Sequence, residues 1–187
     1  MRTDFTTHTN LMPCRCALAV LMFSLTLAGC GTGLDTALQV NSVTGFEASS
    51  IFSPAGHSIA ELPGGRFRIT AMGSPSTPRA RVEKIAVARA ADFGLEQKKK
   101  FFQTSAPQSS IRCGKRDYIE KGEKKKLPAK GYTVVEVDVA YADTATDPGF
   151  RLVHETADTL KAELLAEVVP DDVRAQTANE VRAQCGG

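Results

Sequence analysis

The feature that most limits what this chain can fold into is an apolar run over residues 16–28, close to the N-terminus. Arg15 precedes the run, and small residues end it. A basic flank, an apolar core of roughly 7–15 residues and small residues at a cut site are typical of an export signal. A membrane-spanning helix needs about 20 apolar residues, so the run is too short for one. The sequence therefore predicts that residues 1–29 are a removable signal peptide, starting at Met1 or at Met12.

The end of the run, Leu27-Ala28-Gly29-Cys30, resembles the lipobox of bacterial lipoprotein precursors. The resemblance implies that Cys30 receives diacylglycerol and a fatty acid such as palmitate, and that the membrane is contacted through this lipid anchor alone. Gly31 follows where inner-membrane lipoproteins of enteric bacteria have aspartate, so we expect attachment to the outer membrane, facing the periplasm. The alternatives are an uncleaved anchor helix and a chance match.

Residues 30–64 follow the signal and are rich in Gly, Ser, Thr and Ala, with no sustained period of a helix or a strand. They are predicted to be the acylated cysteine and a flexible tether, on which Phe46 is a candidate for docking against the domain. A Leu-Pro-Gly-Gly turn signal marks the end of the tether. Residues 65–187 are long enough for one domain. The formal net charge of the chain is +2, which gives no reason to expect nucleic acid as a partner.

Alternating apolar and polar residues predict strands over residues 66–72 and 132–142, and a further short strand is expected at residues 101–104, before Pro107. A helix is expected from Pro78 to about Gln97, with Thr77 as its N-cap. Two more helices should follow, one with the apolar stripe Ala157, Leu160, Leu164 and Val168, and one after Pro170 carrying Val173, Val181 and Cys185. This order predicts an α+β fold class, a two-layer domain with a small, largely antiparallel sheet packed against two or three helices.

The cysteines predict a disulfide. Of the five cysteines, Cys14 and Cys16 leave with the signal peptide and Cys30 is consumed by acylation. Cys113 and Cys185 remain in an oxidising compartment, where two thiols most simply form a disulfide. The bond would close a loop of about 72 residues, and in the chain-entropy model such a loop stabilises the folded state by roughly 4 kcal/mol. The alternative is that Cys185, near the end of the chain, is free or pairs between molecules.

Residues 112–130 are polar and strongly basic, and they are predicted to form a long exposed loop or a hairpin arm. The candidate contacts to anionic lipid or another envelope polyanion are Lys121, Lys124, Lys125 and Lys126. Each such cation contributes about 1 kcal/mol near a charged surface. The alternative is that the basic run is only a solvated face.

Arg89 falls in the middle of the apolar stripe of the first helix, between Ile85 and Phe93. A guanidinium there must be paired in a partly buried site or extend outwards along the helix. Its candidate partners are Asp92, Glu96, Glu136 and Asp138. We expect a buried ion pair that joins the helix to the sheet; the alternative is an anchor for an anionic ligand group.

Several short motifs resemble a family of small, uncharacterised envelope lipoproteins of Gram-negative bacteria. The matching segments are Gly56-His57-Ser58, Arg66-Phe67-Arg68-Ile69, Gly73, Val82-Glu83 and Arg89-Ala90-Ala91-Asp92. The resemblance covers roughly residues 56–102. It implies a location in the envelope, but no activity and no site residues.

The chain offers few candidates for chemistry. His57 and His154 are not at ligand spacing with cysteines or paired carboxylates, so no metal or other cofactor is expected. A Gly-x-Ser-x-Gly elbow is absent from the sequence, and Asp171-Asp172 is interpreted as a helix cap. We therefore expect a non-catalytic module that binds or scaffolds another envelope protein or an anionic envelope polymer. The alternative is a cell-envelope hydrolase with an unrecognised active site.

Overall fold

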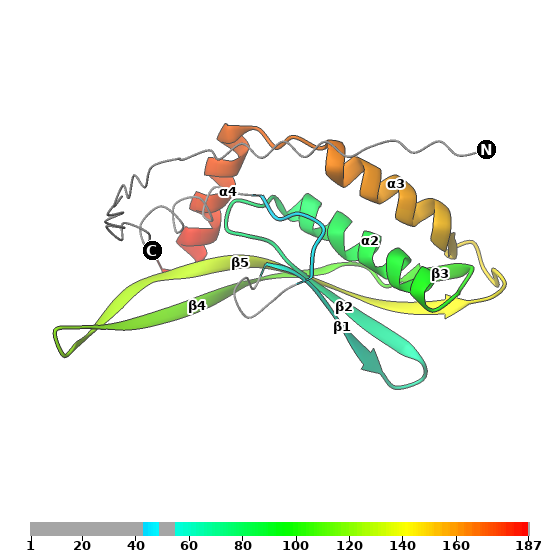
Figure 1. Ribbon diagram of the computed structural model, residues 1–187, viewed down its shortest axis with the longest axis horizontal. Coiled ribbons are helices and arrows are strands. Elements are labelled where there is room, and N and C mark those ends of the chain that lie inside the picture. The colour runs from blue at the N-terminus through cyan, green and yellow to red at the C-terminus, as the bar shows by residue number, and fades with distance from the viewer. Residues whose placement is uncertain (1–42, 49–54, 187) are drawn as a thin grey trace, which may run out of the picture. The chain divides into compact units, whose positions relative to one another are not determined.

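The computed structural model describes residues 43–48 and 55–186, in which an antiparallel sheet carries helices on one face (Figure 1). The elements in chain order are β1 (Gly56–Leu62), β2 (Arg66–Met72), α2 (Arg79–Glu96), β3 (Phe101–Thr104), β4 (Gln108–Glu120), β5 (Glu123–Ala142), β6 (Arg151–Leu152), α3 (Val153–Ala166) and α4 (Asp171–Gln184). The strand order is β1-β2-β5-β3-β6, and β4 pairs with β5. The predicted α+β class and the largely antiparallel sheet are confirmed.

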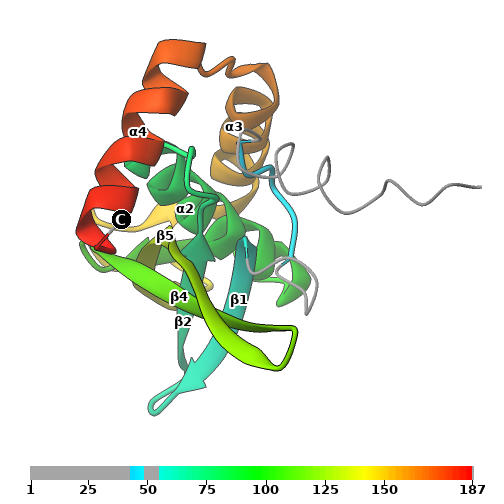
Figure 2. The same ribbon diagram turned by 90° about the vertical axis from the view of Figure 1, so that its left-hand side faces the viewer.

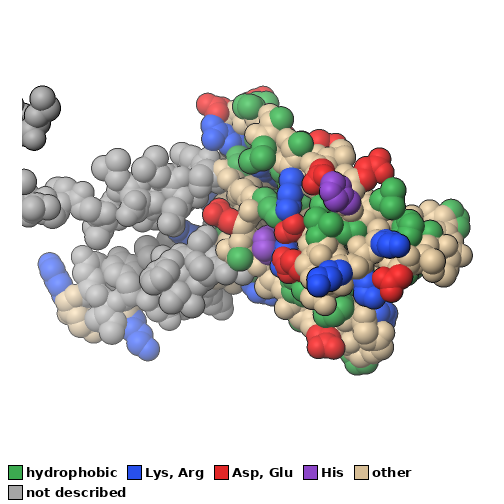
Figure 3. Space-filling model, turned by 45° about the vertical axis from the view of Figure 1, so that its right-hand side comes forward, with side chains coloured by type: hydrophobic (Ala, Val, Ile, Leu, Met, Phe, Trp, Pro, Cys, Tyr) green, Lys and Arg blue, Asp and Glu red, His purple; other side chains and the backbone are tan. Residues whose placement is uncertain are grey.

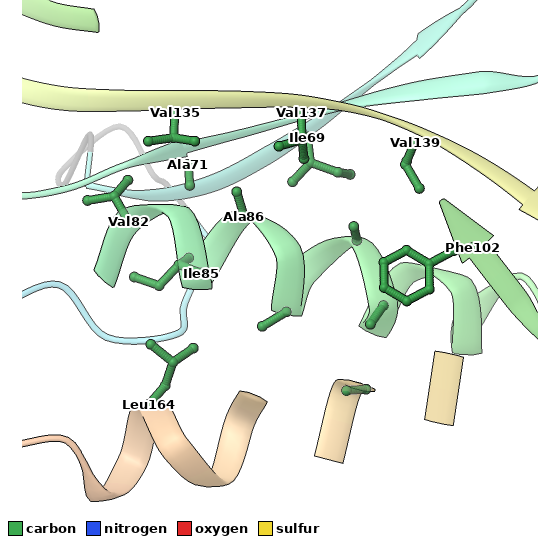
Figure 4. Close-up of a cluster of buried hydrophobic side chains, with 14 of the residues drawn as sticks. Ile69, Ala71, Val82, Ile85, Ala86, Phe102, Val135, Val137, Val139 and Leu164 are labelled. Atoms are coloured by element: carbon green, nitrogen blue, oxygen red, sulfur yellow. The ribbon is translucent and has the colours of Figure 1, made fainter. Parts of the chain in front are cut away.

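The centre of the sheet is the pair β2–β5, which places two alternating apolar series on the same face. Ile69 lies opposite Val137 and Ala71 opposite Val135. These four side chains and Val139 are 0–1% exposed. The period of two residues, which predicted both strands, therefore builds the floor of the hydrophobic core (Figure 4).

Helix α2 lies directly on this floor through Val82 and Ala86, and α3 packs on the side of α2 that faces away from the sheet (Figure 4). Leu164 of α3 points towards α2 and is 3% exposed. Because α2 has neighbours on two sides, its buried residues are spread over more than one stripe and include Ala88 and Ala91. None of the described helices is long and apolar enough to cross a membrane.

The predicted start of the domain at residue 65 is too late. Strand β1 lies within the range 30–64 predicted to be a tether, and it pairs with β2 along its whole length. The sequence signal of this edge strand is weak because Ile59 is the one large apolar residue in its centre. Upstream of β1, Phe46 packs against the core, as predicted. Cys30 and the predicted signal peptide lie outside the described residues.

The stretch 112–130 is a hairpin arm rather than a loop. Strands β4 and β5 continue to pair beyond the sheet, with one register shift between Gly114 and Arg116, and end with Glu120 opposite Glu123. The two turn residues, Lys121 and Gly122, have φ of 53° and 85°. Positive φ at both central positions is typical of the type I′ turn, whose twist matches that of the two strands. The arm and the core therefore share one uninterrupted strand, β5 (Figure 1).

Two details of the helices differ from the predictions. Thr77 is not the N-cap of α2: the residue before the helix is Pro78, with no side-chain cap. The Thr77 hydroxyl instead contacts the hydroxyl of Thr44 at 3.1 Å, because the segment 43–48 docks there. Val168 is not part of the apolar stripe of α3, since the helix ends at Ala166 and Val168 is 87% exposed.

Candidate functional site

The base of the hairpin arm is held by the predicted disulfide, which the structure confirms. Cys113 of β4 and Cys185, the residue after α4, are joined by an S–S bond of 2.01 Å. Gly131 of β5 lies opposite Cys113, and a Cβ added to it would be 2.4 Å from a methyl carbon of Val181. A glycine is needed there for α4 to approach the arm so closely (Figure 2).

Helix α4 has little else to hold it in place. Val181 is its single buried residue, at 3% exposure, and Val173 is 38% exposed. The remaining residues of the helix are mostly polar and exposed. The position of α4 therefore depends on one apolar contact with β5 and on the disulfide with β4.

The predicted polyanion-binding residues lie at the far end of the arm. Lys121 occupies the turn and Lys124 is the second residue of the return strand β5, and both side chains are exposed. Lys125 and Lys126 lie further along β5 by their backbone, opposite Tyr118 and Asp117, while their side chains are outside the description. The fold thus brings the four lysines to one end of the hairpin.

The arm differs from the rest of the domain in its charge balance: residues 112–130 carry eight Lys and Arg against three Asp and Glu, whereas the remainder of residues 65–187 carries 13 against 14. No ion pair is formed by the side chains of Arg112, Lys121, Lys124 or Lys130 within the described part of the chain. Elsewhere, many Lys and Arg side chains lie next to Asp and Glu side chains, as the face shown in Figure 3 illustrates, although Arg66, Lys98, Lys100, Arg151 and Arg182 form no ion pair with described residues either. The unbalanced positive charge of the domain is therefore concentrated on the arm.

Arg89 is partly buried, with its side chain 13% exposed, and it is paired within its own helix. Its Nη1 lies 3.0 Å from Oδ2 of Asp92 and 2.6 Å from Oε1 of Glu96. Asp92 also accepts a hydrogen bond from Lys161 of α3. The expectation of a link to the sheet is therefore wrong: this cluster joins α2 to α3.

The sheet carboxylates that were candidate partners of Arg89 have partners of their own. Asp138 accepts a hydrogen bond from Nε of Arg68 at 2.8 Å, and Glu136 accepts one from the Thr70 hydroxyl at 3.3 Å. Both pairs connect β5 to β2, since the four residues lie on the face of the sheet opposite the core. Arg89 is on the helix side and cannot reach them.

The two histidines are not brought together. His57 is half-buried, with its ring centroid 5.2 Å from that of Phe46, and burial followed by the charge of Arg89 lowers its pKa below the ordinary value. His154 lies on α3 with its Nδ1 3.0 Å from Asp158. In the ranges 43–48 and 55–186, no three His, Cys, Asp or Glu residues converge as metal ligands would.

Arg81 is the buried charge that the sequence analysis missed. Its side chain is 8% exposed. Nε donates to the carbonyl of Thr44 at 3.1 Å, and Nη2 donates to the carbonyl of Leu164 at 2.9 Å. Nη1 lies 3.3 Å from Oε2 of Glu167. One signal was present: Arg81 precedes Ile85 and Ala88 at helical spacing, and so begins a second apolar stripe of α2.

The arm and its base are thus the most distinctive exposed features, and they come from residues far apart in the sequence. The resemblance to envelope lipoproteins stays a prediction. The chain matches no known protein-family model, and no curated protein or solved structure is significantly similar to it.

Proposed function

We propose that this chain is a lipid-anchored lipoprotein of the bacterial cell envelope, attached to the outer membrane on the periplasmic side. In this proposal it is a non-catalytic binding module, and the β4–β5 arm contacts an anionic surface of the envelope, either lipid or polymer. The observation that carries the proposal is the excess of positive charge on the arm, where eight Lys and Arg residues stand against three Asp and Glu, in a domain whose other charges nearly cancel.

A cation that already has a carboxylate partner gains little from a second anion. Arg79 lies 2.7 Å from Glu83, and Lys99 lies 3.2 Å from Asp143. Lys121 and Lys124 of the arm have no such partner to lose. Each can contribute about 1 kcal/mol close to an anionic surface, an effect that salt screens over about 10 Å at 0.1 M.

The shape of the arm supports the same role. The part of β5 from Glu123 to Gly131 extends beyond the helices (Figure 1), and at 3.3 Å per residue it is about 26 Å long. A hairpin that is already formed does not have to be ordered when it binds, so less of the interaction free energy is lost. The basic tip is therefore presented away from the domain on a preformed support.

The first test is vesicle binding by the chain from residue 31 onward, which falls within one compact unit. We expect it to bind anionic vesicles, and the double substitution Lys121→Gln, Lys124→Gln to weaken binding about thirtyfold, from about 1 kcal/mol per lysine. Binding should fall steeply as salt is raised.

The matched control is Lys98→Gln, Lys100→Gln, which removes two exposed lysines at the end of α2. This variant should bind anionic vesicles nearly as well as the unmodified protein. Equal binding of neutral and anionic vesicles, or equal losses in both double variants, would contradict the role of the arm.

The second test concerns the lipid anchor. We expect Cys30 to incorporate a fatty-acid analogue in a Gram-negative host, and Cys30→Ala to leave an unlabelled precursor that keeps its signal peptide. Two or three acyl chains would hold the protein firmly on the membrane, whereas one gives only marginal binding. Equal labelling of the unmodified chain and of Cys30→Ala would rule out this anchor.

A further inference from the structure

The turn between α3 and α4 carries the two most exposed large apolar side chains of the described residues. Leu165, in the last turn of α3, and Val168, just after the helix, are each 87% exposed. The next in order are Leu152 at 48%, Val173 at 38% and Leu95 at 37%. A single exposed apolar residue is common on protein surfaces, whereas two neighbouring ones that are almost fully exposed point to an interaction site. We call Leu165 and Val168 the apolar corner.

The described chain begins beside this corner. Nε of Arg81 donates to the carbonyl of Thr44 at 3.1 Å, and Nη2 of the same guanidinium donates to the carbonyl of Leu164 at 2.9 Å. One side chain therefore connects the start of the segment 43–48 to the residue that precedes Leu165. The N-terminal part of the protein thus enters the domain at the apolar corner.

The predicted lipid anchor is close to this entry point along the chain. About 13 residues lead from Cys30 to Val43. At 3.3–3.6 Å per residue they span at most about 45 Å. A bilayer that holds the acyl chains of Cys30 therefore lies within that distance of Val43. The side of the domain that carries the entry point reaches such a bilayer with the shortest length of chain.

The charged side chains next to the corner are paired with one another. Nζ of Lys84 lies 3.0 Å from Oε2 of Glu167 and 3.3 Å from Oε2 of Glu163. Nη1 of Arg81 also lies 3.3 Å from Oε2 of Glu167. Two cations of α2 thus balance the two acidic residues at the end of α3, and the corner presents apolar carbon without a strong field of either sign.

The start of α4 adds a slight excess of negative charge. Asp171 is paired with Arg174, and Asp172 forms no ion pair within the described part of the chain. The basic arm belongs to the sheet layer, whereas the turn between α3 and α4 lies at the outer side of the helix layer (Figures 1 and 2). The two surfaces therefore suit different partners: an anionic one for the arm, and a neutral apolar one for the corner.

We propose that Leu165 and Val168 insert into the surface of the bilayer that holds Cys30, so that the helix layer of the domain rests on neutral lipid. The inference rests on the proposed lipid anchor, because binding at a lipid surface scales with the apolar area buried and two side chains bury little. The anchor brings the corner to the lipid, and the two side chains then fix the orientation of the domain. In this orientation the sheet faces away from the anchoring bilayer.

The test attaches the domain to lipid without relying on acylation in cells. The chain from Cys30 onward has one free thiol, since Cys113 and Cys185 are joined. This thiol is coupled to a maleimide-headgroup lipid in phosphatidylcholine nanodiscs that contain a spin-labelled lipid. We expect the paramagnetic broadening of amide signals to be strongest at Leu165 and Val168 and weakest at the turn between β1 and β2. A lack of acylation in cells would refute the anchor and leave this measurement unaffected, so the two failures are distinguishable.

Leu165→Gln, Val168→Gln should reduce the broadening over residues 163–170 at least threefold and leave the melting temperature unchanged, since both side chains are exposed. The matched control is Leu95→Gln, Leu152→Gln, which replaces apolar residues at the end of α2 and just before α3 and should keep the original pattern.

The inference is overturned if the broadening is uniform over the domain, if it is strongest at the arm or at the turn between β1 and β2, or if Leu165→Gln, Val168→Gln keeps the original pattern. It is also overturned if the amide signals of the corner shift with protein concentration when no lipid is present, because a second copy of the chain then covers the corner.

Discussion

Replacing Arg81 with alanine is expected to lower the free energy of unfolding by about 3–5 kcal/mol, the usual effect of removing one partner of a buried pair. The side chain is 8% exposed and holds the carbonyls of Thr44 and Leu164, which would lose their donor. Since domains are stable by about 5–15 kcal/mol, this is a large share of the total. Urea unfolding followed by circular dichroism would measure it.

Two other arginines of α2 provide a graded comparison. Arg79→Ala removes an exposed ion pair, with the arginine side chain 65% exposed, and should change the stability by only about 0.2–1 kcal/mol. The loss of stability caused by Arg89→Ala should lie between those of Arg81→Ala and Arg79→Ala, since the Arg89 side chain is 13% exposed but that of its partner Glu96 is 51% exposed. Similar, small effects at Arg81 and Arg79 would mean that the segment 43–48 and the end of α3 are not held by Arg81.

The second large effect is expected from the disulfide. Cys113 and Cys185 are 72 residues apart, so removing the bond with Cys113→Ala, Cys185→Ala should lower the stability by roughly 4 kcal/mol in the chain-entropy model. The loss of local stability should be greatest in helix α4, because Val181 is its single buried residue. Hydrogen exchange of the amides in α4 should therefore become faster than exchange in α2.

A reducing agent provides the control for this experiment. It should destabilise the unmodified protein to the level of the double variant and leave the double variant unchanged. If α4 stays as protected in the double variant as in the oxidised protein, then the contact of Val181 with Gly131 alone is enough to hold it.

Those parts of the fold that could be predicted from the sequence are the ones that local patterns encode. The alternation of Ile69 and Ala71, and of the valines of β5, reflects burial on one face of a sheet, and so both strands were found. The disulfide followed from counting cysteines, since only Cys113 and Cys185 remain if, as predicted, the signal peptide is removed and Cys30 is acylated. In each case the signal lies in the residues themselves and needs no knowledge of the tertiary structure.

Other features depend on contacts that no local pattern records. Strand β1 is polar enough to resemble a tether, and it is ordered by its pairing with β2. The role of Arg81 depends on two carbonyls, those of Thr44 and Leu164, which lie 37 and 83 residues away. A hollow lined by Thr133 of β5 and by Thr177 and Val181 of α4 likewise brings together residues that are far apart in the sequence.

The shared strand β5 also limits how the length of the arm can change during evolution. The core fixes the register of β5 from Val134 onwards, where it pairs with β2. The hairpin already contains one register shift, between Gly114 and Arg116, and a further insertion in one strand alone would shift the pairing again and turn the side chains between the insertion and the turn to the other face. Insertions or deletions should therefore be tolerated when they add or remove equal numbers of residues on both sides of the turn at Lys121 and Gly122. Homologous chains should accordingly vary in the reach of the arm while keeping the same core.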